Sequence, residues 1–504
     1  MQPRKIFNLI MALFLATGLI GSFAPPTVNA ASRLHPALAE IASQTPDQAV
    51  RVIVQKADKT TDAEQRVAQL GGTVIRDLAI INAFAADMSA EAAVELSKTG
   101  SVRWVSLDAP VEKSGKPGPT TTTPPDNSFL DSMRVRDVWS MGLDGTGIGV
   151  AIIDSGIATD SDWRTNPKNY TFSLNSKSAT DIYGHGTHVA GIIAGTGRDS
   201  NGRYMGIAPG VTLFSIKIAD GDGMAYESDV VAGLAWVLLN KGAYNIRVVN
   251  LSLNTTTNQS YHESPLDAAI EILWFNGVVV VASAGNVDPQ DSQGDGKFYN
   301  ASPANDPFII TVGAMDEKGT ASTSDDVIAA YTSMGISMDG FKKPEIFAPG
   351  SNIYSVLSQN SPWKTQYPDR VVLNGEYIRL SGTSMSAPMV AGAVALLLQD
   401  EPNLTPDQVK YRLMNASRSH CVRSGKITIC YPVLDVYSAV TGTTTASANT
   451  GILPSQLLYS GTEPISWGSV GWNSVGWNSV GWNSVGWNSV GWNSVGWNST
   501  YWGP

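Results

Sequence analysis

The sequence predicts an α/β fold for the largest part of the chain, with a parallel sheet covered by helices on both faces. Short apolar runs alternate with longer helical patterns between residues 129 and 440. The run GVVVVA at 277–282 is apolar throughout, as expected of a strand buried on both faces. At 504 residues the chain also exceeds what one hydrophobic core usually organises, so two or three folded units are expected.

A small α+β unit is predicted at residues 31–113, before the large one. Strand patterns lie at residues 50–54, 73–88 (two strands) and 102–107, and helical patterns at 62–70 and 89–100. This βαββαβ order is typical of a two-layer, ferredoxin-like fold. The Pro- and Thr-rich stretch at 114–128 cannot bury a core and predicts an exposed linker.

The N-terminal 30 residues have the pattern of a secretory signal. A positive region at Arg4 and Lys5 precedes an apolar stretch, and small residues follow at 28–30. This pattern predicts cleavage after Ala30 and export of the protein. A membrane anchor is the alternative, although the apolar stretch is short for one.

The C-terminus consists of a predicted polar linker at 441–465 and a GWNSV repeat at 466–504. A period of five keeps the tryptophans on neither one strand face nor one helix stripe. Two interpretations stay open. The tail is either an adhesive module that retains the secreted protein at the cell surface, or else a low-complexity spacer or a segment removed during maturation.

Charge and cysteine content exclude some classes of partner. The net charge of −10 and the pI near 5.0 argue against a nucleic-acid partner. The two cysteines, Cys421 and Cys430, flank a predicted turn, which favours a local disulfide in an oxidising compartment. Two unrelated thiols are the alternative, and neither cysteine has the spacing of a zinc site.

Four polar residues stand at strand ends or helix starts of the large unit. Asp154 follows the strand pattern at 148–153, and Asn286 follows the run at 277–282. His185 and Ser384 each begin a predicted helix rich in small and apolar residues. Each residue alone could serve as a helix cap or a turn residue. Together they are expected to meet at one edge of a parallel sheet, where ligands bind.

These residues lie in motifs that resemble those of the subtilisin family of serine peptidases. The motifs are DSG at 154–156, GHGTH at 184–188 and GTSMSAP at 382–388. The chain order Asp, His, Ser is also the family's order. The resemblance covers residues 129–440, and residues 46–112 resemble the family's inhibitory propeptide by pattern only.

The resemblance implies a secreted serine endopeptidase that acts on polypeptides and needs no cofactor for catalysis. Asp154, His185 and Ser384 would form the catalytic triad. The side chain of Asn286, with the Ser384 backbone N–H, would bind the oxyanion. The unit at 31–113 would act as an intramolecular inhibitor of a self-processed zymogen. A permanent accessory domain is the alternative for this unit.

The resemblance also places two segments beside the substrate. These are Gly221, Asp222 and Gly223, and Ser252, Leu253 and Asn254, between which a peptide would add as a strand. Subtilisins commonly carry glycine where this chain has Asn254, so the side chain is expected to narrow the pocket for the residue before the cut. Asp222 adds negative charge to the rim.

Metal sites are not assignable from the sequence. His188 lies one helical turn after His185, but the glutamate of metallopeptidases does not follow the first histidine, so a structural role is expected. The loop at 196–202 does not match the family's usual calcium loop. The Asp-rich segment at 288–295 is more typical of solvated carboxylates than of an ion site, so structural calcium stays a hypothesis without a location.

Three other functional classes fit the sequence less well. A surface-binding protein would use the repeat tail as its principal part and the peptidase mainly for self-processing. A lipase is disfavoured because the segment around Ser384 lacks the second glycine of the nucleophile elbow. A Ser-Glu-Asp acid peptidase is disfavoured by the glycine-flanked His185.

Overall fold

The computed structural model describes residues 33–113, 127–287, 301–424 and 427–458. The predicted signal, most of the 114–128 linker, the segment at 288–295 and the repeat tail lie outside these residues. Within the described part, no helix is both long and apolar enough to cross a bilayer.

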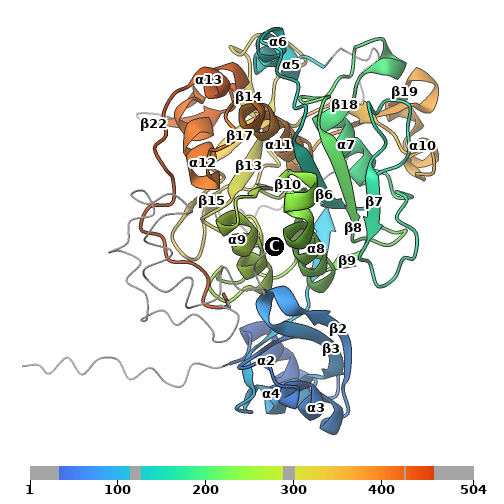
Figure 1. Cartoon of the computed structure of the whole chain (residues 1–504), viewed down its shortest axis with the longest axis vertical. Helices are drawn as coiled ribbons and strands as arrows, with labels where there is room; N and C mark the ends of the chain where they lie inside the picture. Colours follow the sequence, from blue (N-terminus) through green and yellow to red (C-terminus); the bar gives the residue numbers. More distant parts are fainter. Residues whose placement is uncertain (1–32, 114–126, 288–300, 425–426, 459–504) are drawn as a thin grey trace, which may run out of the picture.

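A ten-stranded sheet forms the centre of the molecule (Figure 1). Eight neighbouring strands run parallel in the order β22-β17-β13-β12-β10-β6-β8-β7. Two antiparallel strands, β21 and β14, pair with β22 and β13. The strands are β6 (Gly149–Asp154), β7 (Lys168–Thr171), β8 (Thr212–Lys217), β10 (Ile246–Leu251), β12 (Val279–Ser283), β13 (Ile310–Asp316), β14 (Val327–Ile328), β17 (Ile346–Pro349), β21 (Arg418–Ser424) and β22 (Ile427–Val433).

Helices cover both faces of this sheet, as the sequence predicts. From β6 the chain reaches β8 in one direction through α7 (His185–Ala194), then returns through α8 (Glu227–Tyr244) and α9 (Pro265–Phe275) towards β10 and β12. Because parallel crossovers are right-handed, this change of direction puts α7 on one face and α8 and α9 on the other. Helix α11 (Thr383–Asp400) packs on α7 and on the central strands. It is apolar on all sides and buried along nearly its whole length.

The N-terminal unit has the predicted βαββαβ order. Its sheet is antiparallel in the order β2-β3-β1-β4, formed by β1 (Ala49–Lys56), β2 (Thr73–Leu78), β3 (Ala83–Ser89) and β4 (Val102–Leu107). Its helices are α2 (Pro36–Gln44), α3 (Asp62–Gln69) and α4 (Ala90–Ser97), which pack on one face around Leu38, Val52 and Phe84. Residues including Ile53 and Trp104 belong instead to the core of the large unit. In Figure 1 the blue unit meets the ends of α8 and α9, where β2 contacts α8.

The C-terminal part of the large unit differs from the expected linker at 441–465. After α12 (Pro406–Asn415) and α13 (Val436–Thr441), the chain stays packed on the surface of the large unit up to residue 458. Leu457 and Leu458 are buried in the main core. The polar composition of residues 441–451 masked the apolar sequence ILPSQLL at 452–458.

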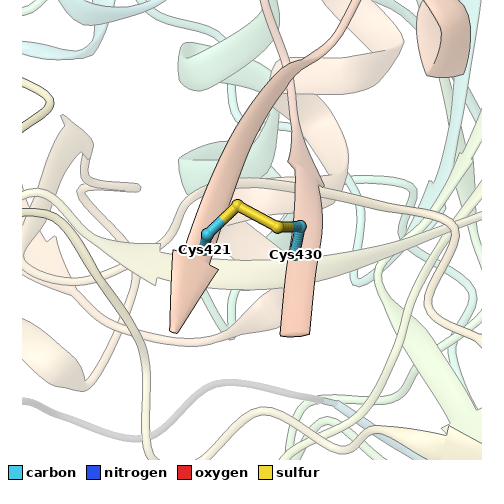
Figure 2. Close-up of a disulfide and its surroundings, with 2 residues drawn as sticks. All are labelled: Cys421 and Cys430. Atoms are coloured by element: carbon cyan, nitrogen blue, oxygen red, sulfur yellow. A yellow bond between two sulfur atoms is a disulfide. The ribbon is translucent and has the colours of Figure 1, made fainter. Parts of the chain in front are cut away.

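The two cysteines form a disulfide across a hairpin (Figure 2). Cys421 on β21 pairs directly with Cys430 on β22, and their sulfurs are 2.04 Å apart. The bond therefore links neighbouring strands, as the short spacing in the sequence predicts.

Candidate active site

Three adjacent strands bring the candidate residues to one edge of the sheet. Asp154 is the last residue of β6, Ser252 follows the last residue of β10, and Asn286 comes shortly after β12. These strands are parallel neighbours, so their carboxyl ends lie side by side. This is the arrangement expected from the four strand-end and helix-start positions.

Asp154 and His185 form a buried pair. The Nδ1 atom of His185 lies 2.8 Å from both carboxylate oxygens of Asp154. The side chains are 2% and 1% exposed. A carboxylate accepts hydrogen bonds, so it fixes the proton of a neutral imidazole on Nδ1 and leaves Nε2 as the acceptor. Nε2 has no hydrogen-bond partner in the part of the chain that the structure describes.

Asp181 determines where the helix that carries His185 begins. Its Oδ1 accepts the backbone N–H of Gly184 at 2.8 Å. Its Oδ2 accepts the N–H and the hydroxyl of Thr187 at 2.9 and 2.6 Å. A buried carboxylate at a helix N-terminus satisfies free N–H groups and complements the helix dipole. The motifs around His185 do not include this residue, although an acidic residue four positions before His185 is a recognisable capping signal.

A close backbone approach explains the glycine that follows His185. A Cβ atom at Gly186 would lie 2.2 Å from the carbonyl oxygen of Gly156 and 3.1 Å from the Cβ of Asp154. No larger residue fits there without moving α7 away from β6. The glycine therefore permits the Asp154–His185 contact.

Ser384 is the second residue of α11 and is fully buried. Its hydroxyl donates to the carbonyl oxygen of Ser252 at 3.1 Å, and the Ser252 hydroxyl donates to the carbonyl oxygen of Ser384 at 3.0 Å. These two bonds tie the start of α11 to the end of β10. Rotation about the Cα–Cβ bond gives the Ser384 hydroxyl its other staggered positions.

The side chain of Asn286 is oriented by the residue before Ser384. Its Oδ1 accepts the backbone N–H and the hydroxyl of Thr383 at 3.0 and 3.2 Å. The oxygen is thereby turned towards Thr383, and the NH₂ group remains available as a donor beside the start of α11.

A strand of the chain itself lies in the expected substrate position. β5 (Pro110–Lys113) is the middle strand of an antiparallel sheet in the order β11-β5-β9. On one side Val111 and Lys113 pair with Thr255 and Leu253 of β11 (Leu253–Thr255).

On the other side β5 pairs with β9 (Ala225–Tyr226) and not with the expected segment Gly221–Gly223. Asp220 explains the difference. Its backbone N–H donates to the carbonyl oxygen of Met224 at 2.9 Å, and its Oδ1 accepts the Met224 N–H at 2.9 Å. These bonds close a turn over 221–223, which leaves Asp222 exposed on the rim.

The family model described as "Subtilase family" matches residues 145–452. The chain belongs to the subtilase family. Serine protease AprX of Bacillus subtilis is 39% identical over 286 residues, which cover 55% of this chain and 62% of AprX. Subtilisin DY of Bacillus licheniformis is 32% identical over 285 residues, which cover 56% of this chain and 89% of the relative.

A solved structure shares the subtilase fold over a larger part of the chain. Fervidolysin from Fervidobacterium pennivorans, described as a keratinolytic enzyme related to subtilisin, aligns with a TM-score of 0.60 and 24% identity. The alignment covers 79% of this chain and 61% of fervidolysin. At this identity the likeness shows the fold alone.

In this subtilase, Asn254 links the two segments that follow β10 and β12. Its side-chain NH₂ donates to the carbonyl oxygen of Ser283 at 3.2 Å, and the side chain is largely buried. A Cβ atom at Gly285 would also lie 3.4 Å from its Nδ2. The side chain therefore occupies space between these segments that a glycine would leave open.

His188 has the surroundings of a structural residue. Its Nε2 lies 3.2 and 3.1 Å from the carbonyl oxygens of Ile353 and Ile378, and burial lowers its pKa to about 3. Among the described residues, no group of three or more His, Cys, Asp or Glu side chains is arranged to hold a metal ion. In the loop at 196–202, the N–H of Arg198 donates to Asp162 at 2.6 Å.

Proposed function

We propose that this subtilase is a secreted serine endopeptidase in which Asp154, His185 and Ser384 are the catalytic residues. The observation that carries the proposal is the buried Asp154–His185 pair, whose Nε2 is left as an acceptor at the sheet edge where Ser384 begins α11. Family membership and the similarity to AprX, a serine protease, support the same activity. Export rests on the N-terminal sequence.

With the His185 proton on Nδ1, the unprotonated Nε2 can act as the general base in peptide-bond hydrolysis. The Ser384 hydroxyl transfers its proton to Nε2 of His185 while Oγ forms a bond to the carbonyl carbon of the substrate. The carbonyl oxygen gains negative charge, which the NH₂ of Asn286 and the Ser384 N–H stabilise. The imidazolium, stabilised by Asp154, returns the proton to the leaving amine as the C–N bond breaks. Water then hydrolyses the acyl-enzyme by the same transfers.

We further propose that the N-terminal unit is an inhibitory propeptide. The support is that β5 lies between β9 and β11 as an added strand, which is how an extended peptide substrate would bind. Asp108, two residues before β5, accepts the N–H and the hydroxyl of Ser228 at 2.8 and 2.7 Å at the start of α8. The unit thus contacts both the cleft and a helix beside it.

Substitution of Ser384 tests the assignment of the nucleophile. Ser384→Ala is expected to abolish casein hydrolysis and labelling by a fluorophosphonate, since no other hydroxyl replaces the nucleophile. Ser386→Ala is the matched control. Ser386 is a buried serine of the same helix, and its hydroxyl has no partner among the described residues. Proteolysis by the Ser384→Ala protein at the control's rate would reject the proposal.

A further inference from the structure

The C-terminal segment 452–458 lies at the junction between the N-terminal unit and the large unit. In Figure 1 the red end of the described chain runs from the α12 and α13 region down beside α9, towards the blue unit. Leu457 and Leu458 are 3% and 0% exposed. They belong to the same buried cluster as Ile53 and Trp104 of the N-terminal unit.

The large unit holds this segment by hydrogen bonds to α9 and to the loop before it. The N–H of Ser455 donates to Oε2 of Glu271 at 2.7 Å, and the hydroxyl of Tyr261 donates to the carbonyl oxygen of Leu453 at 2.7 Å. The N–H of Gln456 donates to the carbonyl oxygen of His262 at 2.9 Å. These hydrogen bonds hold the segment on the large unit independently of the N-terminal unit.

Two side chains of the N-terminal unit reach across to the backbone of this segment. The side-chain NH₂ of Gln55, on β1, donates to the carbonyl oxygen of Leu457. The guanidinium of Arg103, on β4, donates to the carbonyl oxygen of Gln456. Gln55 is 2% exposed, and its NH₂ also donates to the carbonyl oxygen of Ile81 in its own unit at 3.0 Å. Release of the unit would therefore deprive the Leu457 carbonyl of this donor, whereas the Gln55 amide keeps Ile81. Neither contact involves β5 or the catalytic cleft.

We propose that residues 452–458 form a clasp, a second docking surface that retains the N-terminal unit on the large unit. This proposal rests on the proposed function, because only a propeptide has to be released. The clasp is joined by the chain to the large unit, so it stays there after the linker is cut. With the clasp in place, the N-terminal unit is released more slowly than if it were held only by β5 in the cleft and by Asp108 at α8.

Release can be measured without any peptidase activity. The full chain with Ser384→Ala would carry a recognition sequence for a site-specific protease inserted in the 114–126 stretch. After cutting, dissociation of the N-terminal unit would be followed by size-exclusion chromatography and by exchange with a labelled unit. Casein hydrolysis by the unmodified wild type, measured separately, reports on the proposed function alone.

The clasp predicts specific changes in the release rate. Combined Gln55→Ala and Arg103→Ala should accelerate release by about tenfold or more, the effect typical of losing one buried and one partly buried hydrogen bond. Arg66→Ala is the control, because Arg66 of α3 bonds Gln69 of its own helix. Ending the chain after residue 451 should accelerate release further, whereas ending it after Leu458 should leave the rate unchanged.

The truncation after residue 451 could destabilise the large unit, so thermal unfolding is measured for each variant. The double variant changes only the N-terminal unit and keeps the test valid if that truncation does not fold. Release at the Arg66→Ala rate in the double variant would overturn the clasp. Faster release after removal of residues 459–504 alone would overturn the assignment to 452–458.

Discussion

The amide of Asn286 is held by one specific partner, and this gives it a testable role. Its oxygen is bound to Thr383, so the NH₂ group is fixed before any substrate arrives. Asn286→Ala should lower kcat by about 10²–10³ with little change in KM, because the donor acts on charge that develops in the transition state. This magnitude is the one known for subtilisin, a family relative. A change confined to KM would contradict the assignment.

Asp181 is expected to influence catalysis through the position of His185, since it accepts hydrogen bonds at the start of α7. Asp181→Ala removes acceptors from the first turn of α7, which should cost about 1–2 kcal/mol of folding free energy. It should also lower kcat, since His185 is the first residue of that helix. Asp181→Asn, which keeps one acceptor oxygen, should lose less folding free energy and less kcat than Asp181→Ala. Thermal unfolding and steady-state kinetics measure the two effects, and unchanged kcat in a destabilised protein would leave Asp181 a purely structural residue.

Asn254 is expected to set the size of the residue before the scissile bond. Its side chain spans the gap to Ser283, so small or slender residues should be preferred there. Asn254→Gly should open this space and shift the preference towards Phe and Tyr. Cleavage of a mixed peptide library by the two proteins measures the shift. A wild type that already prefers Phe or Tyr, with no change in the variant, would reject the prediction.

The register of β5 places the proposed self-cleavage site close to Lys113. Lys113 pairs with Leu253, and the preceding residue, Ser252, is hydrogen-bonded to Ser384. The nucleophile therefore lies just beyond the residue that pairs with Lys113. Cleavage is expected at one of the two bonds that follow Lys113, so that the mature protein starts at Ser114 or Gly115.

N-terminal sequencing of the purified wild type and of the Ser384→Ala protein measures this cut. The variant should retain the N-terminal unit. A wild-type N-terminus before Pro110 or after Asn127 would show that β5 does not lie in the cleft as a substrate does.

At the scale of the whole molecule, Asp108 links docking of the N-terminal unit to pH. Burial raises its pKa to about 6 against the hydrogen bonds from Ser228, which lower it; the charge of Asp229 raises the pKa further, and Arg51 lowers it. Glu227, buried beside it, has its pKa raised to about 8 by burial and by the charge of Asp108. Once released, Asp108 would return to the ordinary aspartate pKa of about 4.

Because the pKa of Asp108 is higher in the docked form, docking of the N-terminal unit should weaken as the pH rises. The docked form binds protons more tightly than the released form, so docking is strongest below pH about 4 and weakens as the pH rises through 6. Release of the N-terminal unit also removes the charge of Asp108 from beside Glu227, whose pKa of about 8 that charge helps to raise. Docking therefore continues to weaken as the pH rises towards 8. Release of the unit from the cut Ser384→Ala chain should be up to about a hundredfold faster at pH 8 than at pH 4, and Asp108→Asn should remove most of the difference. Equal pH dependence in both proteins would contradict the role of Asp108.

The sequence by itself determined the sheet, its helices and the positions of the four candidate residues. These features depend on local patterns: apolar runs that can only be buried, and glycine-flanked motifs at their ends. Gly186 illustrates why the motif is informative, because the contact it permits excludes any side chain at that position.

Only the tertiary structure decided which distant segments meet. The pairing of β5 with Ala225–Tyr226 and the burial of 452–458 depend on contacts between residues far apart in the chain. Composition averages over such segments: Leu457 and Leu458 look like part of a polar linker in the sequence, yet both are buried in the main core. Burial of a short segment is determined by the surfaces that surround it, and no local pattern encodes those surfaces.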